Sequence, residues 1–128
     1  MDEPEELAAL IAQLNTQADP AHADWTAGMH GLIAQGLAVL PGLLPLLDHE
    51  QSLIRLRAQR VLERVSHDWL ATQIVEQPLR RRVARASALL WTRNGAYDWQ
   101  AESQHRQAAM ARWQDWLAAP AVPASSPP

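Results

Sequence analysis

Five arginines lie close together in residues 78–94 and are the residues of this sequence best suited to binding chemistry. They are Arg80, Arg81, Arg82, Arg85 and Arg93. A guanidinium group donates forked hydrogen bonds to carboxylates and phosphates. Arginines at i, i+1, i+2 and i+5 spread around more than half of a helix, so some of them must face solvent. The cluster therefore predicts a surface for an acidic protein or for nucleic acid, with a solvated or structural role as the alternative.

Arg55 and Trp99 complete the set of residues predicted to contact a partner. Arg55 stands near the start of another apolar-striped helix, where it either faces the partner or pairs with carboxylates or carbonyls of a neighbouring turn. Trp99 stands at a loop–helix junction and is expected to be the more exposed of the tryptophans in the last third of the chain. Exposed tryptophan is frequent in binding hot spots. The others are expected to close the core, with an aromatic contact patch as the alternative, and they are Trp91, Trp113 and Trp116.

Little in the sequence favours catalysis or metal binding. Cysteine is absent, which excludes thiolate ligands and thiol nucleophiles. The five histidines form neither an H-E-x-x-H motif nor a pair at i and i+4. There is no G-x-S-x-G motif and no phosphate-binding glycine loop. We therefore expect no enzyme activity, no cofactor and no metal site.

Charge is distributed unevenly along the chain. The net charge is −3, yet residues 1–50 carry −8 and residues 51–128 carry +5. Each half can simply solvate its own surface. The asymmetry also suits a basic face for an acidic partner, or head-to-tail self-association of the chain.

The sequence is expected to be cytoplasmic, with no membrane contact. Its first ten residues are acidic and lack the basic region of a secretory signal. The longest apolar run, residues 37–47, is too short to span a bilayer and contains two prolines. All eleven basic residues are Arg, and with many Ala, Leu and Pro residues this is typical of a GC-rich bacterial genome.

Apolar periodicity and breaker residues predict an all-α domain over residues 1–118 and a disordered Pro/Ala/Ser tail over 119–128. Gly36 and Asn94-Gly95 are expected to end helices, and Pro45 to kink or shorten one. The predicted helices cover residues 2–17, 21–35, 37–48, 52–66, 69–76, 78–94 and 99–118.

Three of these helices share one pattern of steps between apolar or small residues, four, three and four. The pattern links Ile54, Ala58, Val61 and Val65, then Leu79, Val83, Ala86 and Leu90, and also Trp25, Met29, Leu32 and Gly36. In each case another predicted helix comes first, and in two of the three it is shorter. The repetition predicts a stack of about three antiparallel helical hairpins with a C-terminal capping helix.

Residues 39–62 resemble a HEAT repeat, and residues 3–36 and 68–118 resemble this family less closely. The matching residues are Val39-Leu40-Pro41, Leu43-Leu44, Leu46-Leu47, Asp48, Ile54-Arg55, Ala58 and Leu62. The resemblance implies a HEAT-like stack, and HEAT-like proteins mostly bind other proteins along a helical surface. A few bind nucleic acid and a few are enzymes, so fold alone does not settle function. We expect a non-enzymatic interaction or scaffold module, with nucleic-acid binding through residues 80–85 as the alternative.

Overall fold

The computed structural model describes residues 3–14, 18–19 and 22–119. This part of the chain is predominantly helical, which confirms the all-α class. One short antiparallel pairing joins β1 and β2 with an irregular register. In chain order the elements are α1 (Glu3–Leu14), β1 (Ala18–Asp19), β2 (His22–Thr26), α2 (Ala27–Ala34), the 3₁₀ turn η1 (Gly36–Val39), α3 (Leu40–Leu43), the 3₁₀ turn η2 (Leu44–Asp48), α4 (Ser52–Gln73), α5 (Leu79–Arg93) and α6 (Ser103–Ala118).

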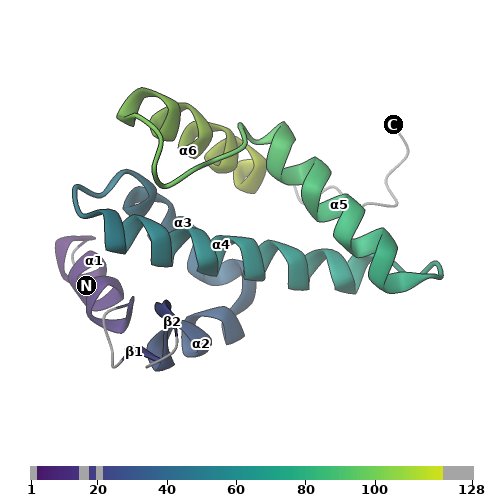
Figure 1. Cartoon of the computed structure of the whole chain (residues 1–128), viewed down its shortest axis with the longest axis horizontal. Helices are drawn as coiled ribbons and strands as arrows, with labels where there is room; N and C mark the ends of the chain where they lie inside the picture. The colour runs from purple at the N-terminus through teal and green to yellow at the C-terminus, as the bar shows by residue number, and fades with distance from the viewer. Residues whose placement is uncertain (1–2, 15–17, 20–21, 120–128) are drawn as a thin grey trace.

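Helix α4 runs through the middle of the molecule, with α1 and α2 on one side and α5 and α6 on the other (Figure 1). Its predicted apolar face is confirmed, because that face is buried along its whole length. The buried residues are Ile54, Ala58, Val61, Leu62 and Val65. The N-terminal helices, residues 36–48 and α5 therefore pack against one central helix, whereas α6 packs mainly on η2.

The predicted break after Ser66 is wrong, because α4 continues without interruption to Gln73. The Ser66 hydroxyl donates to the Leu62 carbonyl over 2.8 Å. This is a hydrogen bond within the helix, so the Ser66 side chain does not cap a helix end. Arg64 and Asp68 form an i, i+4 ion pair of 3.0 Å across the same region. The separate helix predicted over 69–76 is therefore the last part of α4, followed by a loop.

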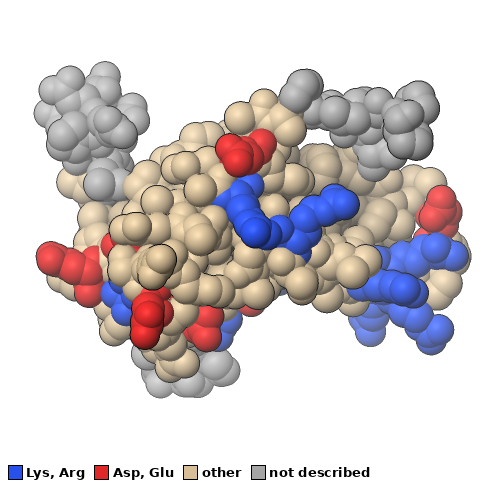
Figure 2. Space-filling model, turned by 90° about the horizontal axis from the view of Figure 1, so that it is seen from above, with Lys and Arg blue, Asp and Glu red and all other residues tan. Residues whose placement is uncertain are grey.

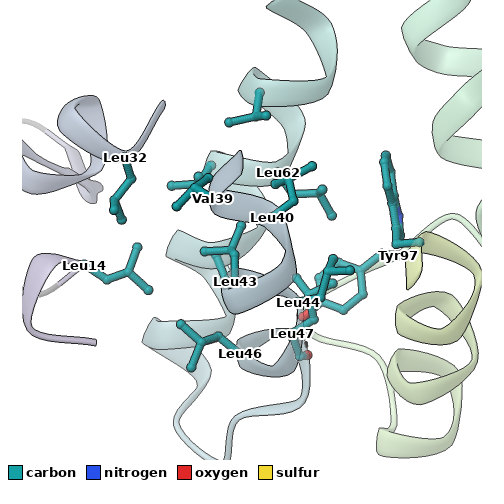
Figure 3. Close-up of a cluster of buried hydrophobic side chains, with 14 of the residues drawn as sticks. Leu14, Leu32, Val39, Leu40, Leu43, Leu44, Leu46, Leu47, Leu62 and Tyr97 are labelled. Atoms are coloured by element: carbon teal, nitrogen blue, oxygen red, sulfur yellow. Dashed lines mark hydrogen bonds between the residues drawn. The ribbon is translucent and has the colours of Figure 1, made fainter. Parts of the chain in front are cut away.

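Residues 36–48 form a chain of short helical turns, as the two prolines require. Pro45 has no N–H and cannot donate to the Pro41 carbonyl, so α3 covers only four residues before the chain tightens into η2. The leucines of this segment nevertheless point into the core (Figure 3). The buried ones are Leu40, Leu43, Leu44, Leu46 and Leu47.

Helix α2 begins six residues later than the predicted start at residue 21. The backbone at Thr26 is extended, and its hydroxyl accepts from the Met29 N–H over 3.2 Å, which makes Thr26 the N-cap. The segment before it pairs with β1. The predicted end is confirmed, because α2 stops at Ala34 and Gly36 has a φ of +69°, a conformation that favours glycine.

Helix α5 has nearly the predicted bounds, whereas α6 begins at Ser103 instead of Trp99. Two short-range hydrogen bonds explain the late start: the Gln100 N–H donates to the Asp98 carboxylate over 2.8 Å, and the Ala101 N–H donates to the Asp98 carbonyl over 3.0 Å. These bonds fold residues 98–101 into a turn. Ala109 and Trp113 form the buried side of α6.

The hairpins differ from the predicted pattern of one short helix before each long helix. Residues 36–48 pair with α4, and α5 returns along the second half of α4 after a short loop (Figure 1). No separate short helix precedes α5 in this part of the described chain. The last three residues of the helix predicted over 2–17, and the predicted tail from residue 120 onward, lie outside the described residues.

Candidate interaction surface

The first two turns of α5 carry the predicted basic cluster on the surface of the molecule. Val83 faces the interior, and the arginines around it are exposed. Figure 2 shows them as a blue group at the right end of the molecule, where α5 begins. We call this group the α5 cluster, and it consists of Arg80, Arg81, Arg82 and Arg85.

Three arginines of the α5 cluster have guanidinium groups with no partner among the described residues. Arg80, Arg81 and Arg85 make no hydrogen bond or ion pair with any residue that the structure describes. Arg82 turns back to the preceding loop, where its Nε donates to the Gln77 carbonyl over 3.2 Å and its Nη1 lies 3.6 Å from Glu76 Oε2. The cluster therefore presents to solvent three guanidinium groups that have no partner among the described residues.

The position of the α5 cluster concentrates positive potential. The N-terminus of a helix already carries a partial positive charge, and the first turn of α5 contains no acidic residue. Arginines at this end strengthen that charge instead of compensating it. Together they favour an anionic group of a partner.

Arg55 occupies a structural position, which is the alternative that the sequence left open. Its Nε donates to the Trp99 carbonyl over 2.9 Å, and its Nη1 donates to the His49 and Glu50 carbonyls over 2.7 and 3.1 Å. These bonds join the loop before α4 to the loop before α6. The half-buried guanidinium is thus directed at the backbone of its own chain.

Trp99 is half-buried and packs against the core, so the expected exposure is only partial. Its backbone N–H donates to Gln59 Oε1 over 3.0 Å, and its backbone carbonyl accepts from Arg55. Arg55 lies in the first turn of α4 with Trp99 hydrogen-bonded to it, whereas the α5 cluster lies beyond the other end of α4. The two sites are separated by about 27 Å of helix, because an α-helix rises 1.5 Å per residue. The six predicted contact residues therefore form two groups and not one surface.

Aromatic rings form a continuous series from α4 to the loop before α6. Centroid distances along it are 5.4 Å for Trp69–Trp116, 5.4 Å for Trp116–Trp113, 5.6 Å for Trp113–Trp91 and 6.4 Å for Trp91–Tyr97. All four contacts are edge-to-face, a favourable geometry for aromatic pairs. Trp113 is fully buried, so this tryptophan closes the core.

Tyr97 and Asp48 attach α6 and its loop to η2, and sequence inspection did not identify either contact. The Tyr97 hydroxyl donates to the Leu47 carbonyl over 2.6 Å, and burial raises the pKa of the phenol. Hydrogen bonds from Gln107, Ser103 and Arg106 hold the pKa of the Asp48 carboxyl below its usual value. Partners about 50 residues apart leave no local pattern in a sequence.

An open, mostly apolar groove of about 640 Å³ lies between the second half of α4, α5 and α6. The residues that line it are Trp69, Leu70, Ala86, Leu89, Leu90, Thr92, Arg93 and Trp116. Leu89 is 63% exposed at its edge, a high value for a large apolar side chain. We call this feature the α5 groove, and no local pattern in the sequence indicates it, because its lining comes from three helices.

The described residues offer no group of three or more His, Cys, Asp or Glu side chains that could hold a metal ion. Among them no single helix is long and apolar enough to cross a membrane, although one pair bent by 115°, residues 27–34 with 36–48, meets the length and composition test.

Comparisons with family models, curated proteins and solved structures find no match to this chain.

Proposed function

We propose that this chain is a small non-enzymatic interaction module that binds an acidic surface of another protein. The observation that carries the proposal is the set of exposed guanidinium groups of Arg80, Arg81 and Arg85, which have no partner among the described residues. Carboxylates of a partner would satisfy these donors with charge-assisted hydrogen bonds. The negative net charge of the chain favours a protein over nucleic acid, whose binding domains are usually basic.

We also propose that the module is HEAT-like. The pairing of residues 36–48 with α4 supports this, because it has the form of one HEAT hairpin. The hydrogen bonds of Arg55 support it further, since the matching HEAT arginine is expected to pair with turn groups of a neighbouring hairpin. Arg55 donates to the Trp99 carbonyl in the loop before α6, besides the His49 and Glu50 carbonyls of its own hairpin. Such a module would act as a scaffold, and a cytoplasmic location stays a prediction.

Nucleic-acid binding is the second candidate function. The same helix N-terminus and the same arginines would suit phosphate groups. Phosphate contacts release counterions, so affinity would fall by orders of magnitude as salt is raised. A protein interface that also buries apolar surface would lose much less affinity.

The test is affinity capture from a lysate of the source cells, with and without nuclease, followed by measurement of the affinity of the recovered partner. The variant is Arg80→Ala/Arg81→Ala, which removes two unpaired charges. The matched control is Arg60→Ala/Arg64→Ala, which removes two charges from the ion pairs with Glu63 and Asp68 on α4. We expect the first variant to weaken binding about tenfold and the control to bind like the parent chain.

A nuclease-resistant protein whose affinity depends on Arg80 and Arg81 supports the proposal. If the captured material disappears after nuclease treatment, the proposed protein binding is wrong and nucleic-acid binding takes its place. If only further copies of this chain are recovered, self-association takes the place of the proposed function. The opposite charges of the two halves would drive it. Equal loss in both double variants shows a general charge effect and contradicts a specific α5 surface.

A further inference from the structure

The α5 groove combines an apolar floor with cationic edges. Trp69 and Leu70 of α4 lie on the same side of it as Trp116 of α6, whose ring is 5.4 Å from that of Trp69, and residues of α5 supply the rest of the lining. Within the described part of the chain, Thr92 and Arg93 are its polar lining residues. A floor of this composition stabilises a bound apolar side chain by removing both surfaces from water.

Exposed arginines stand one turn before and one turn after the exposed leucine at the edge. Arg85, Leu89 and Arg93 are spaced at i, i+4 and i+8, so their side chains follow one stripe of α5. Neither arginine side chain has a hydrogen bond or ion pair with a described residue. Arg112 of α6 adds a third positive charge nearby, because its Nη1 donates to the Arg93 carbonyl over 3.1 Å.

The walls of the groove favour a helical occupant. They consist of helices, whose backbone groups are hydrogen-bonded within the helix, so no free edge is available for an added β-strand. An amphipathic helix needs no backbone partner and inserts side chains spaced at i, i+3, i+4 and i+7. Apolar residues alone would leave Arg85 and Arg93 without partners, whereas acidic residues beside the apolar stripe would pair with both.

We propose that the α5 groove binds an acidic amphipathic helix of a partner protein, with Leu89 in the apolar contact and Arg85 and Arg93 paired to carboxylates on either side. This inference rests on the proposed function and specifies the kind of partner. It uses a different part of α5 from Arg80 and Arg81, which allows the two to be tested separately.

The experiment titrates the full chain with a synthetic helical peptide of this chemistry. The peptide has leucines at i, i+3, i+4 and i+7 with glutamates on both sides of the stripe. One control peptide replaces every glutamate with lysine, and a second has the acidic composition in scrambled order. Binding is measured by tryptophan fluorescence, since Trp69 and Trp116 line the groove, and located by amide chemical shifts.

Leu89→Glu is the main variant, because it adds a negative charge to the apolar edge. Its wild-type side chain is 63% exposed, so the fold is expected to survive, as circular dichroism will show. The control is Leu53→Glu at the opposite end of α4, where the leucine is 40% exposed. We expect Leu89→Glu to raise the Kd for the acidic peptide at least about tenfold, Arg85→Ala/Arg93→Ala about fivefold, and Leu53→Glu less than about twofold.

Preference for the ordered acidic peptide, with shifts at residues 69–70, 86–93 and 112–116, supports the inference. Equal binding of the lysine peptide, shifts elsewhere, or no binding of the acidic peptide overturns it. If the natural partner still binds Leu89→Glu but loses Arg80→Ala/Arg81→Ala, the groove is not its site and the proposed function stands. If the acidic peptide binds the groove but the capture experiment recovers only nucleic acid, the proposed function fails instead.

Discussion

The Nε and Nη2 atoms of Arg106 each lie 3.0 Å from Oδ1 of Asp48, and this contact joins the start of α6 to the end of η2 across 58 residues of sequence. Ser103 and Gln107 donate to the same carboxylate over 3.0 and 2.9 Å. All the donors come from the first two turns of α6. A carboxylate at that end also interacts favourably with the helix dipole. The contact fixes α6, and therefore Trp116, beside α5.

Replacing Asp48 with Ala should lower the free energy of unfolding by about 1–3 kcal/mol at neutral pH, because hydrogen bonds to a charged group are lost. The measurement is urea unfolding of the parent chain and the variant. Asp68→Ala is the control, since its ion pair with Arg64 is exposed and is expected to contribute less than about 1 kcal/mol. Equal effects of the two substitutions would contradict a special role for Asp48.

The same carboxylate should make stability depend on pH. Its pKa is lower in the folded chain than the ordinary value of 3.8. A lowered folded pKa stabilises the fold above the unfolded pKa, and that stabilisation is lost as pH falls through the folded pKa. The difference in unfolding free energy between the parent chain and Asp48→Ala should therefore be constant from pH 5 to 7 and shrink below about pH 4. A difference that grows on acidification would show the opposite sign of the shift.

Position 95 should not accept any residue larger than glycine. Its φ is +99°, and a Cβ at this position would lie 3.0 Å from the Ala109 Cα atom of α6. Gly95→Ala should therefore destabilise the chain by about 2–4 kcal/mol through backbone strain and overlap with α6. The control is Gly31→Ala in α2, where a Cβ meets nothing within 4 Å and should stabilise the helix by up to about 1 kcal/mol. Thermal unfolding of both variants checks this, and a neutral Gly95→Ala would contradict the close approach.

The continuity of α4 can be tested with proline. Proline at Ser66 removes a hydrogen bond in the middle of the helix and should cost about 3 kcal/mol or more. Proline at Ser52, the first residue of α4, should be tolerated, because that N–H has no partner within the helix. Chemical unfolding compares the two. A well-tolerated Ser66→Pro would restore the break that the sequence predicted at this point.

Arg55 should act in folding and not in partner binding. Arg55→Ala leaves backbone carbonyls of two loops unpaired, and we expect a loss of about 1–3 kcal/mol. Amide hydrogen exchange should accelerate in residues 95–102, because Trp99 loses one of its two hydrogen bonds to α4. Arg64→Ala, which removes an exposed arginine from the same helix, should leave that loop protected. Loss of partner affinity without a change in exchange would place Arg55 in the interface instead.

Local patterns predicted the parts of the fold that depend on neighbouring residues. The buried face from Ile54 to Val65 follows from helical periodicity, because every residue on that face meets the same core. Gly36 ends a helix through its positive φ, and Pro45 prevents a continuous helix because it lacks an N–H. These effects act within one or two turns, so they are visible in the sequence.

The sequence by itself determined the all-α class, the central apolar face of α4 and the exposed arginines at the start of α5. Only the tertiary structure decided which arginines are free, because Arg55 and Arg81 are chemically alike and differ in the carbonyls that the fold brings within reach. The same holds for Ser66, which suits a cap or a helix interior until its partners are known. The α5 groove and the Asp48–Arg106 contact join segments far apart in the chain, and their geometry depends on how three helices pack and not on any local run of residues.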